Sequence, residues 1–180
     1  MIQAAAFAAW LGAAVIVLSD GRRGLALGLA LTTVAFVALA WAGGDHLAAA
    51  AILFGGAVAA IRRSRSGLDV WGVMPPGSTP RLVLSIAGGL LALWVATSVM
   101  TGPGTELRFA ALSVLGLMGA RILTESERAG ALLTALVALA LSVAMASGLA
   151  AAGRGPAPYI AAALIAVGVS VIHVAEPHAA

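Results

Sequence analysis

The chain contains no cysteine among its 180 residues. Disulfides, thiolate metal sites, iron–sulfur clusters and cysteine nucleophiles are therefore excluded within this chain. Lysine is absent as well, and all ten Lys/Arg positions are arginine. A Schiff base requires a lysine amine, so a seven-helix retinal protein and a lysine-centred proton relay are excluded too.

Charged residues are scarce. Only 9% of the residues are charged and 62% are hydrophobic, and the mean hydropathy is +1.07. A soluble domain carries roughly 25% charged residues. Because this chain has too little polar surface to cover a water-facing globule, we expect lipid to be its main solvent. The composition predicts one all-α integral membrane domain over residues 1–180.

Seven apolar runs are separated by polar connections, which predicts a bundle of about seven transmembrane helices. The predicted helices cover residues 2–18, 25–42, 47–61, 82–100, 107–123, 129–152 and 159–175. The third run and the apolar middle of the fifth are short for a span, which needs roughly 20 residues.

The arginines predict the orientation of this bundle. With seven spans, eight arginines fall on one side of the membrane, and only Arg108 and Arg154 fall on the other. By the positive-inside rule the arginine-rich side is cytoplasmic, so the N-terminus lies outside and the C-terminus inside. The basic pI of about 11.1 therefore reflects membrane topology and lipid headgroup contact. We expect no nucleic-acid partner, because the loops lack interleaved aromatic residues.

The longest polar passage, residues 62–81, is the predicted cytoplasmic loop. Pro75, Pro76 and Pro80 argue against a regular helix there. The passage is also the candidate surface for contact with a partner or with lipid. The residues proposed for that contact are Arg62, Arg63, Arg65, Trp71 and Arg81.

Small residues predict two helix-packing faces. Gly24 and Gly28 have the four-residue spacing that lets helix backbones approach closely in lipid. Ser113, Gly116 and Gly119 follow one another at three-residue spacing on a second face. Each face is explained either by packing inside the bundle or by contact with another subunit. Arg108 and Arg121, near the ends of the fifth helix, are expected to reach outward to headgroups.

The sequence offers no set of residues for catalysis, cofactor binding or metal binding. The acidic residues fall in turns or at helix ends, whereas proton and ion pathways place charges at mid-membrane. His46 and His173 are predicted on opposite sides of the membrane, so they cannot share a haem. No GxSxG motif and no Walker phosphate loop are present.

Two weaker patterns concern the helices as groups. Ser113–Met145 resembles the fourth and fifth helices of the antiporter-like membrane subunits of complex I, but the chain has only apolar residues and one serine where that family carries a membrane glutamate. Ser19–Leu31 and Thr124–Leu136 share an order of polar turn, arginine and small/leucine helix. This similarity predicts a parallel repeat of helices one to three and five to seven, with the fourth as linker.

Two functions remain open from the sequence. The first is a non-catalytic subunit of a larger membrane complex, for which an energy-transducing complex is one candidate. The second is a transporter or channel for a neutral or weakly polar solute, with Thr97, Ser98, Ser142 and Ser147 along its path. An intramembrane enzyme is the least favoured. The predicted location is the inner membrane of a bacterium.

Overall fold

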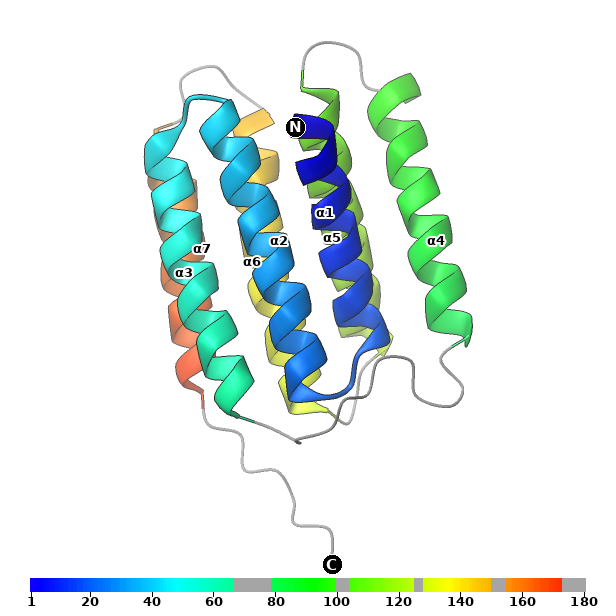
Figure 1. Cartoon of the computed structure of the whole chain (residues 1–180), viewed down its shortest axis with the longest axis vertical. Coiled ribbons are helices and arrows are strands. Elements are labelled where there is room, and N and C mark those ends of the chain that lie inside the picture. The colour runs from blue at the N-terminus through cyan, green and yellow to red at the C-terminus, as the bar shows by residue number, and fades with distance from the viewer. Residues whose placement is uncertain (67–78, 100–103, 125–127, 150–154, 173–180) are drawn as a thin grey trace, which may run out of the picture.

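The computed structural model describes residues 1–66, 79–99, 104–124, 128–149 and 155–172 (Figure 1). Those residues form seven α-helices and one π-helical turn, and they contain no strand. The elements are α1 (Ile2–Leu18), α2 (Arg22–Ala42), α3 (His46–Arg65), α4 (Thr79–Trp94), the π-helix η1 (Val95–Val99), α5 (Thr105–Thr124), α6 (Ala129–Leu149) and α7 (Ala157–Val171).

Each predicted apolar run overlaps one of these helices, but the long polar passage is shorter than predicted at both ends. The last turn of α3 carries Arg62, Arg63 and Arg65. Positive charge is favourable there, because the carbonyl end of a helix is partially negative. At the other end α4 begins at Thr79. Pro80 lies in its first turn, where a missing N–H costs the helix no bond.

Five helices are long and apolar enough to cross a membrane. They are α2, α3, α5, α6 and the continuous segment of α4 and η1 from Thr79 to Ser98. Helices α1 and α7 are also apolar but shorter, with 17 and 15 residues. The structure is therefore that of a helical protein suited to a multi-pass membrane location.

The helices form two layers with α4 at one edge. In Figure 1, α1, α2 and α3 form the front layer, and α5, α6 and α7 lie behind them. Helix α1 contacts α5, α2 contacts α6, and α3 contacts α7. Helix α4 packs against α1 and α5. The described chain is thus divided into three helices, one edge helix and three helices, and the parallel repeat stays a prediction.

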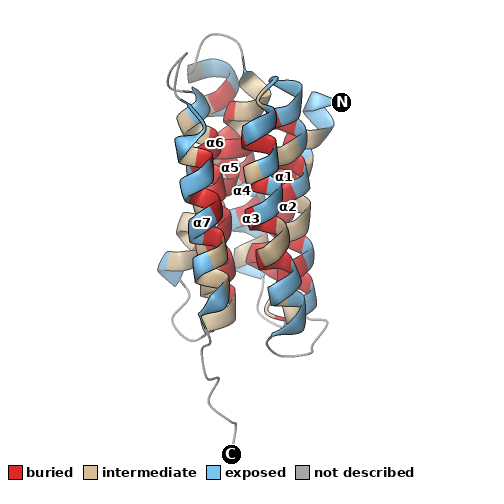
Figure 2. Cartoon of the chain, turned by 90° about the vertical axis from the view of Figure 1, so that its left-hand side faces the viewer, coloured by how far each residue is buried: buried red, intermediate tan, exposed pale blue. Residues whose placement is uncertain are grey.

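Buried residues gather where the two layers face each other, and exposed residues cover the outer faces (Figure 2). The largest apolar side chains in this core include Phe36, Leu117, Met118, Leu141 and Met145. We call the end of the bundle that holds the α1–α2, α3–α4 and α5–α6 connections the arginine-rich end. All eight arginines assigned to one side of the membrane lie there, in the last turns of α3 and α5 or at the starts of α2, α4 and α6.

Glycines bring neighbouring helices into backbone contact. A Cβ placed on Gly28 of α2 would lie 2.8 Å from the carbonyl oxygen of Gly12 in α1. In α3, Gly56 faces Thr33 of α2, and a Cβ on Gly55 would lie 2.7 Å from Cα of Ala163 in α7. Van der Waals packing at such close approach is the main source of helix association in lipid.

We expect Gly12→Ala to lower the stability of the bundle by about 1–3 kcal/mol, because the added methyl group has to push α1 and α2 apart. Thermal unfolding of the purified protein in mild detergent would measure this loss. Gly116→Ala is the matched control, because a Cβ at Gly116 meets nothing within 4 Å. A loss at Gly116 equal to that at Gly12 would contradict the assigned helix contact.

Candidate functional site

The connection between α1 and α2 is very short and places a carboxylate at the arginine-rich end. Helix α1 ends at Leu18, Ser19 and Gly21 have extended backbone, and α2 begins at Arg22. Asp20 lies between them, with its side chain 15% exposed. Because only three residues connect the two helices, the Asp20 carboxylate lies close to the end of α1 and the start of α2.

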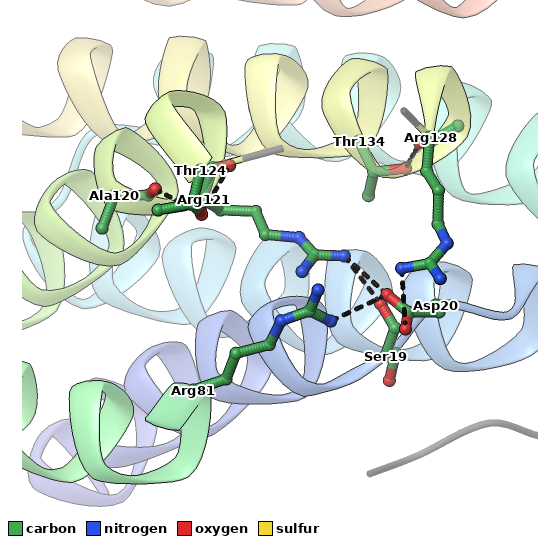
Figure 3. A network of polar contacts seen from close by, with 9 residues as sticks. Ser19, Asp20, Arg81, Ala120, Arg121, Thr124, Arg128 and Thr134 are labelled. Carbon is green, nitrogen blue, oxygen red and sulfur yellow. Dashed lines mark hydrogen bonds and ion pairs between the residues drawn. The ribbon is translucent and has the colours of Figure 1, made fainter. Parts of the chain in front are cut away.

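Three arginines bind this single carboxylate (Figure 3). The Nη2 atom of Arg121 lies 2.8 Å from Oδ1 of Asp20, and Nη1 of Arg81 lies 3.0 Å from the same oxygen. The Nη1 atom of Arg128 lies 3.0 Å from Oδ2. We call these four residues the Asp20 cluster.

The Asp20 cluster joins elements that are far apart in the sequence. Arg81 comes from the first turn of α4, Arg121 from the last turn of α5, and Arg128 directly precedes α6. The carboxylate therefore connects the α1–α2 turn to three further helices. Through Arg81, the carboxylate holds the first turn of α4 against the bundle at this end.

Arg121 is the buried member of the cluster. Its side chain is 1% exposed, whereas those of Arg81 and Arg128 are 33% and 46% exposed. Arg121 also donates from Nη2 to the backbone carbonyl of Ser19 at 3.4 Å. A buried guanidinium is stable only when it is paired, and the Asp20 carboxylate is an ionic partner of Arg121.

The pKa of Asp20 lies below its usual value. Burial by itself raises this pKa, but the hydrogen bond from Arg121 and the positive charges of Arg81 and Arg128 lower it further than burial raises it. Asp20 is therefore ionised near neutral pH.

The expectation that Arg121 reaches outward to headgroups is wrong, because this side chain points into the cluster (Figure 3). Arg108, at the other end of α5, is also buried, and it donates to Thr105 at 3.1 Å. One signal for this ion pair was present in the sequence, because Asp20 lies in a short turn and Arg121 is predicted on the same side of the membrane. The missing information was which helices would be neighbours.

The structure separates the residues that the sequence grouped into the polar passage. Arg62 and Arg65 are exposed and Arg63 is half-buried at the end of α3, on the side of the bundle away from α4. Arg81 belongs to the Asp20 cluster instead. Trp71 lies outside the described residues.

The two small-residue faces have different surroundings. Gly24 and Gly28 are buried, and Gly28 packs against Gly12 and Ile16 within the bundle. On α5, Ser113 is buried, Gly119 is half-buried and Gly116 is exposed. A Cβ at Gly116 or Gly119 would meet nothing within 4 Å, so this part of the second face points away from the rest of the chain.

A second contact fixes the middle of α4. The indole Nε1 of Trp10 in α1 donates to the backbone carbonyl of Ser85 at 3.2 Å, and the Trp10 ring covers Gly89. Gly88 faces Leu117 of α5. Because both glycines lack side chains, α4 can lie against α1 and α5 at this level.

Hydroxyl groups in the helices bond to their own helices. Thr32, Thr134 and Ser142 are buried, and each donates to a backbone carbonyl three or four residues earlier in its own helix. Ser147 does the same, while Thr97 and Ser98 lie exposed in η1. These hydroxyls therefore form no shared polar path between helices in this conformation.

Within the described residues, no group of three or more His, Cys, Asp or Glu side chains is placed to hold a metal ion. The chemistry that the arrangement does offer is ionic, since three arginines meet the Asp20 carboxylate at one end of the bundle. Comparison with protein-family models, curated proteins and solved structures gives no match.

We expect Asp20→Asn to lower the stability by on the order of 3 kcal/mol, because it breaks the buried ion pair with Arg121 and the two ion pairs with Arg81 and Arg128. Unfolding in mild detergent at pH 7 is the measurement. Asp45→Asn is a matched control, because Asp45 caps α3 through the N–H of Ala48, and Asn caps a helix about equally well. Equal losses for the two variants would remove the special role of Asp20.

The stability should also depend on the charge of Asp20 as the pH falls. The folded state holds the pKa of Asp20 below 3.8, so the stabilisation is complete above about pH 4 and is lost as the pH falls through the lowered pKa. Unfolding of the wild type and Asp20→Asn between pH 7 and pH 3 would isolate this effect. The difference between the two proteins should shrink below pH 4, and a constant difference would contradict the ionic account.

Proposed function

We propose that the chain is a non-catalytic integral membrane subunit that supports the assembly of a larger membrane complex. The observation that carries this proposal is the surface of α4. Of the five candidate spans, the α4 segment has the smallest share of residues buried inside the chain. Its exposed large side chains are Val83, Leu84, Ile86, Leu90, Leu91, Leu93 and Trp94.

An apolar face in a membrane is covered by lipid or by another protein. Two further features favour protein. Gly116 and Gly119 of α5 leave open space at the surface, and small residues at a helix surface let another helix approach closely. In η1, Thr97 and Ser98 expose hydroxyl groups, which are better accommodated by a neighbouring helix than by lipid tails.

The orientation of the chain in the membrane is also part of this proposal. The positive-inside rule places the arginine-rich end in the cytoplasm, with the N-terminus outside and the C-terminus inside. The inner membrane of a bacterium is the compartment that we propose. A partner would then contact α4 within the membrane, while the arginines at the end of α3 face the cytoplasm.

A transporter or channel for a neutral solute is the second candidate. The layered arrangement supports it, because many transporters are built from repeats of several helices around a central path. The internally bonded hydroxyls support the subunit instead. Solute uptake by liposomes that contain the purified chain alone would favour the transporter, and absence of uptake with stable co-purified partners would favour the subunit.

The subunit proposal predicts that the full chain, extracted from its native membrane with a mild detergent, co-purifies with other multi-pass chains. Leu90→Trp adds bulk to the exposed face of α4 and should reduce this association without changing thermal stability by more than about 0.5 kcal/mol.

Leu164→Trp is the matched control, because Leu164 of α7 is 67% exposed and Leu90 is 63% exposed. It should leave the association intact. A wild-type chain that is recovered only as a monomer, or equal effects of the two tryptophans, would contradict the proposed role of α4.

A further inference from the structure

The last turn of α3 exposes two arginines that have no other role in the bundle. Arg62 and Arg65 are three residues apart, so their side chains are neighbours on the helix surface. Both are exposed, and neither side chain has a hydrogen bond or an ion pair within the described part of the chain. Arg63 is half-buried, has a contact of its own and points to another side of the helix. The two exposed guanidinium groups are therefore available to a ligand outside the bundle.

The helix keeps these two side chains at a fixed spacing. The Oγ atom of Ser64 donates to the carbonyl of Ile61 at 2.7 Å, and the helix continues to Arg65. A guanidinium has five N–H donors in a planar arrangement. Two neighbouring guanidinium groups can therefore bind the oxygens of one phosphate with well-defined geometry.

Acidic residues are scarce in this part of the sequence. The stretch from Leu47 to Pro80 contains a single acidic residue, Asp69, and three arginines. One carboxylate neutralises only one guanidinium, so the stretch carries a net positive charge of its own. A ligand for Arg62 and Arg65 is expected to be an anion.

An apolar stripe leads away from the arginines along α3. Leu47, Phe54 and Ile61 follow one another at seven-residue spacing, and Arg65 is four residues beyond Ile61, so all four lie on one side of the helix. The three apolar side chains are 67%, 64% and 52% exposed. From Phe54 to Arg65 the helix rises about 17 Å, roughly half of the hydrocarbon core of a bilayer. The stripe therefore has about the length of an acyl chain in one leaflet.

We propose that the end of α3 binds an anionic phospholipid, with Arg62 and Arg65 at the phosphate and the stripe from Ile61 to Phe54 along an acyl chain. The lipid belongs to the leaflet at the arginine-rich end. The two guanidinium groups select an anionic lipid over a zwitterionic one, because they repel the ammonium group of choline or ethanolamine. This inference requires only that the chain lies in a membrane, and it does not depend on the proposed role as a subunit.

The test uses the purified full chain in nonionic detergent, titrated with phosphatidylglycerol and followed by native mass spectrometry. Phosphatidylcholine and the water-soluble headgroup glycerophosphoglycerol are the comparison ligands. We expect phosphatidylglycerol to bind the wild type more tightly than phosphatidylcholine does, and millimolar glycerophosphoglycerol to leave it bound. Arg62→Gln and Arg65→Gln should each weaken the binding by about fivefold, the effect of roughly one basic residue at an anionic surface.

Arg81→Gln is the matched control for charge. It removes one positive charge at the same end of the bundle, but from α4, which lies on the side away from the end of α3 (Figure 1). This variant should bind phosphatidylglycerol as the wild type does. Because Arg62 and Arg65 are exposed and unpaired, their two variants should unfold at the wild-type temperature.

Four outcomes would overturn the proposal. Equal weakening by Arg81→Gln and Arg65→Gln would indicate a general charge effect. Equal binding of phosphatidylcholine would remove the selection by charge. Displacement of the lipid by glycerophosphoglycerol would show that the apolar stripe contributes nothing. Weaker binding only in variants with a lowered unfolding temperature would show that binding follows the integrity of the fold.

Discussion

The structure depends on one carboxylate that three arginines share. Asp20 lies in the tight turn between α1 and α2, and it meets Arg81, Arg121 and Arg128 from three other segments of the bundle. Removing the carboxylate would take from the buried Arg121 an ionic partner at 2.8 Å, and breaking a buried ion pair is strongly destabilising. The same carboxylate holds the first turn of α4 against a bundle that α4 otherwise touches only along one face.

Close backbone contacts organise the apolar part of the bundle. Gly12 and Gly28 join α1 to α2, Gly56 meets Thr33 of α2, and Gly55 meets Ala163 of α7. These contacts hold one three-helix layer together and fasten it to the other. Helix α4 has a different character, because Trp10 and the Asp20 cluster fix it at two levels while most of its apolar surface stays exposed.

The helices could be predicted from hydropathy alone, because a run of apolar residues long enough to cross lipid leaves helix as the main option for the backbone. The ends of the helices could be predicted less well. Charged residues such as Arg62 and Arg65 extend α3 beyond its apolar run, and the helix macrodipole accounts for that extension. The Asp20 cluster could not be predicted, since Arg121 is 101 residues away from Asp20 in sequence and only the packing of α1 against α5 brings them together. The exposure of Gly116 could not be predicted either. The spacing of small residues shows that they share one helix face, but not which helix that face contacts.

The most direct test of this account is the coupling between Asp20 and Arg121 in a double-mutant cycle, with Asp20→Asn, Arg121→Gln and the double variant unfolded in mild detergent at pH 7. If the two side chains form one ionic unit, the double variant should lose less stability than the two single losses combined, by on the order of 2 kcal/mol. A coupling below about 0.3 kcal/mol, the level seen for independent sites, would contradict the central role of the cluster.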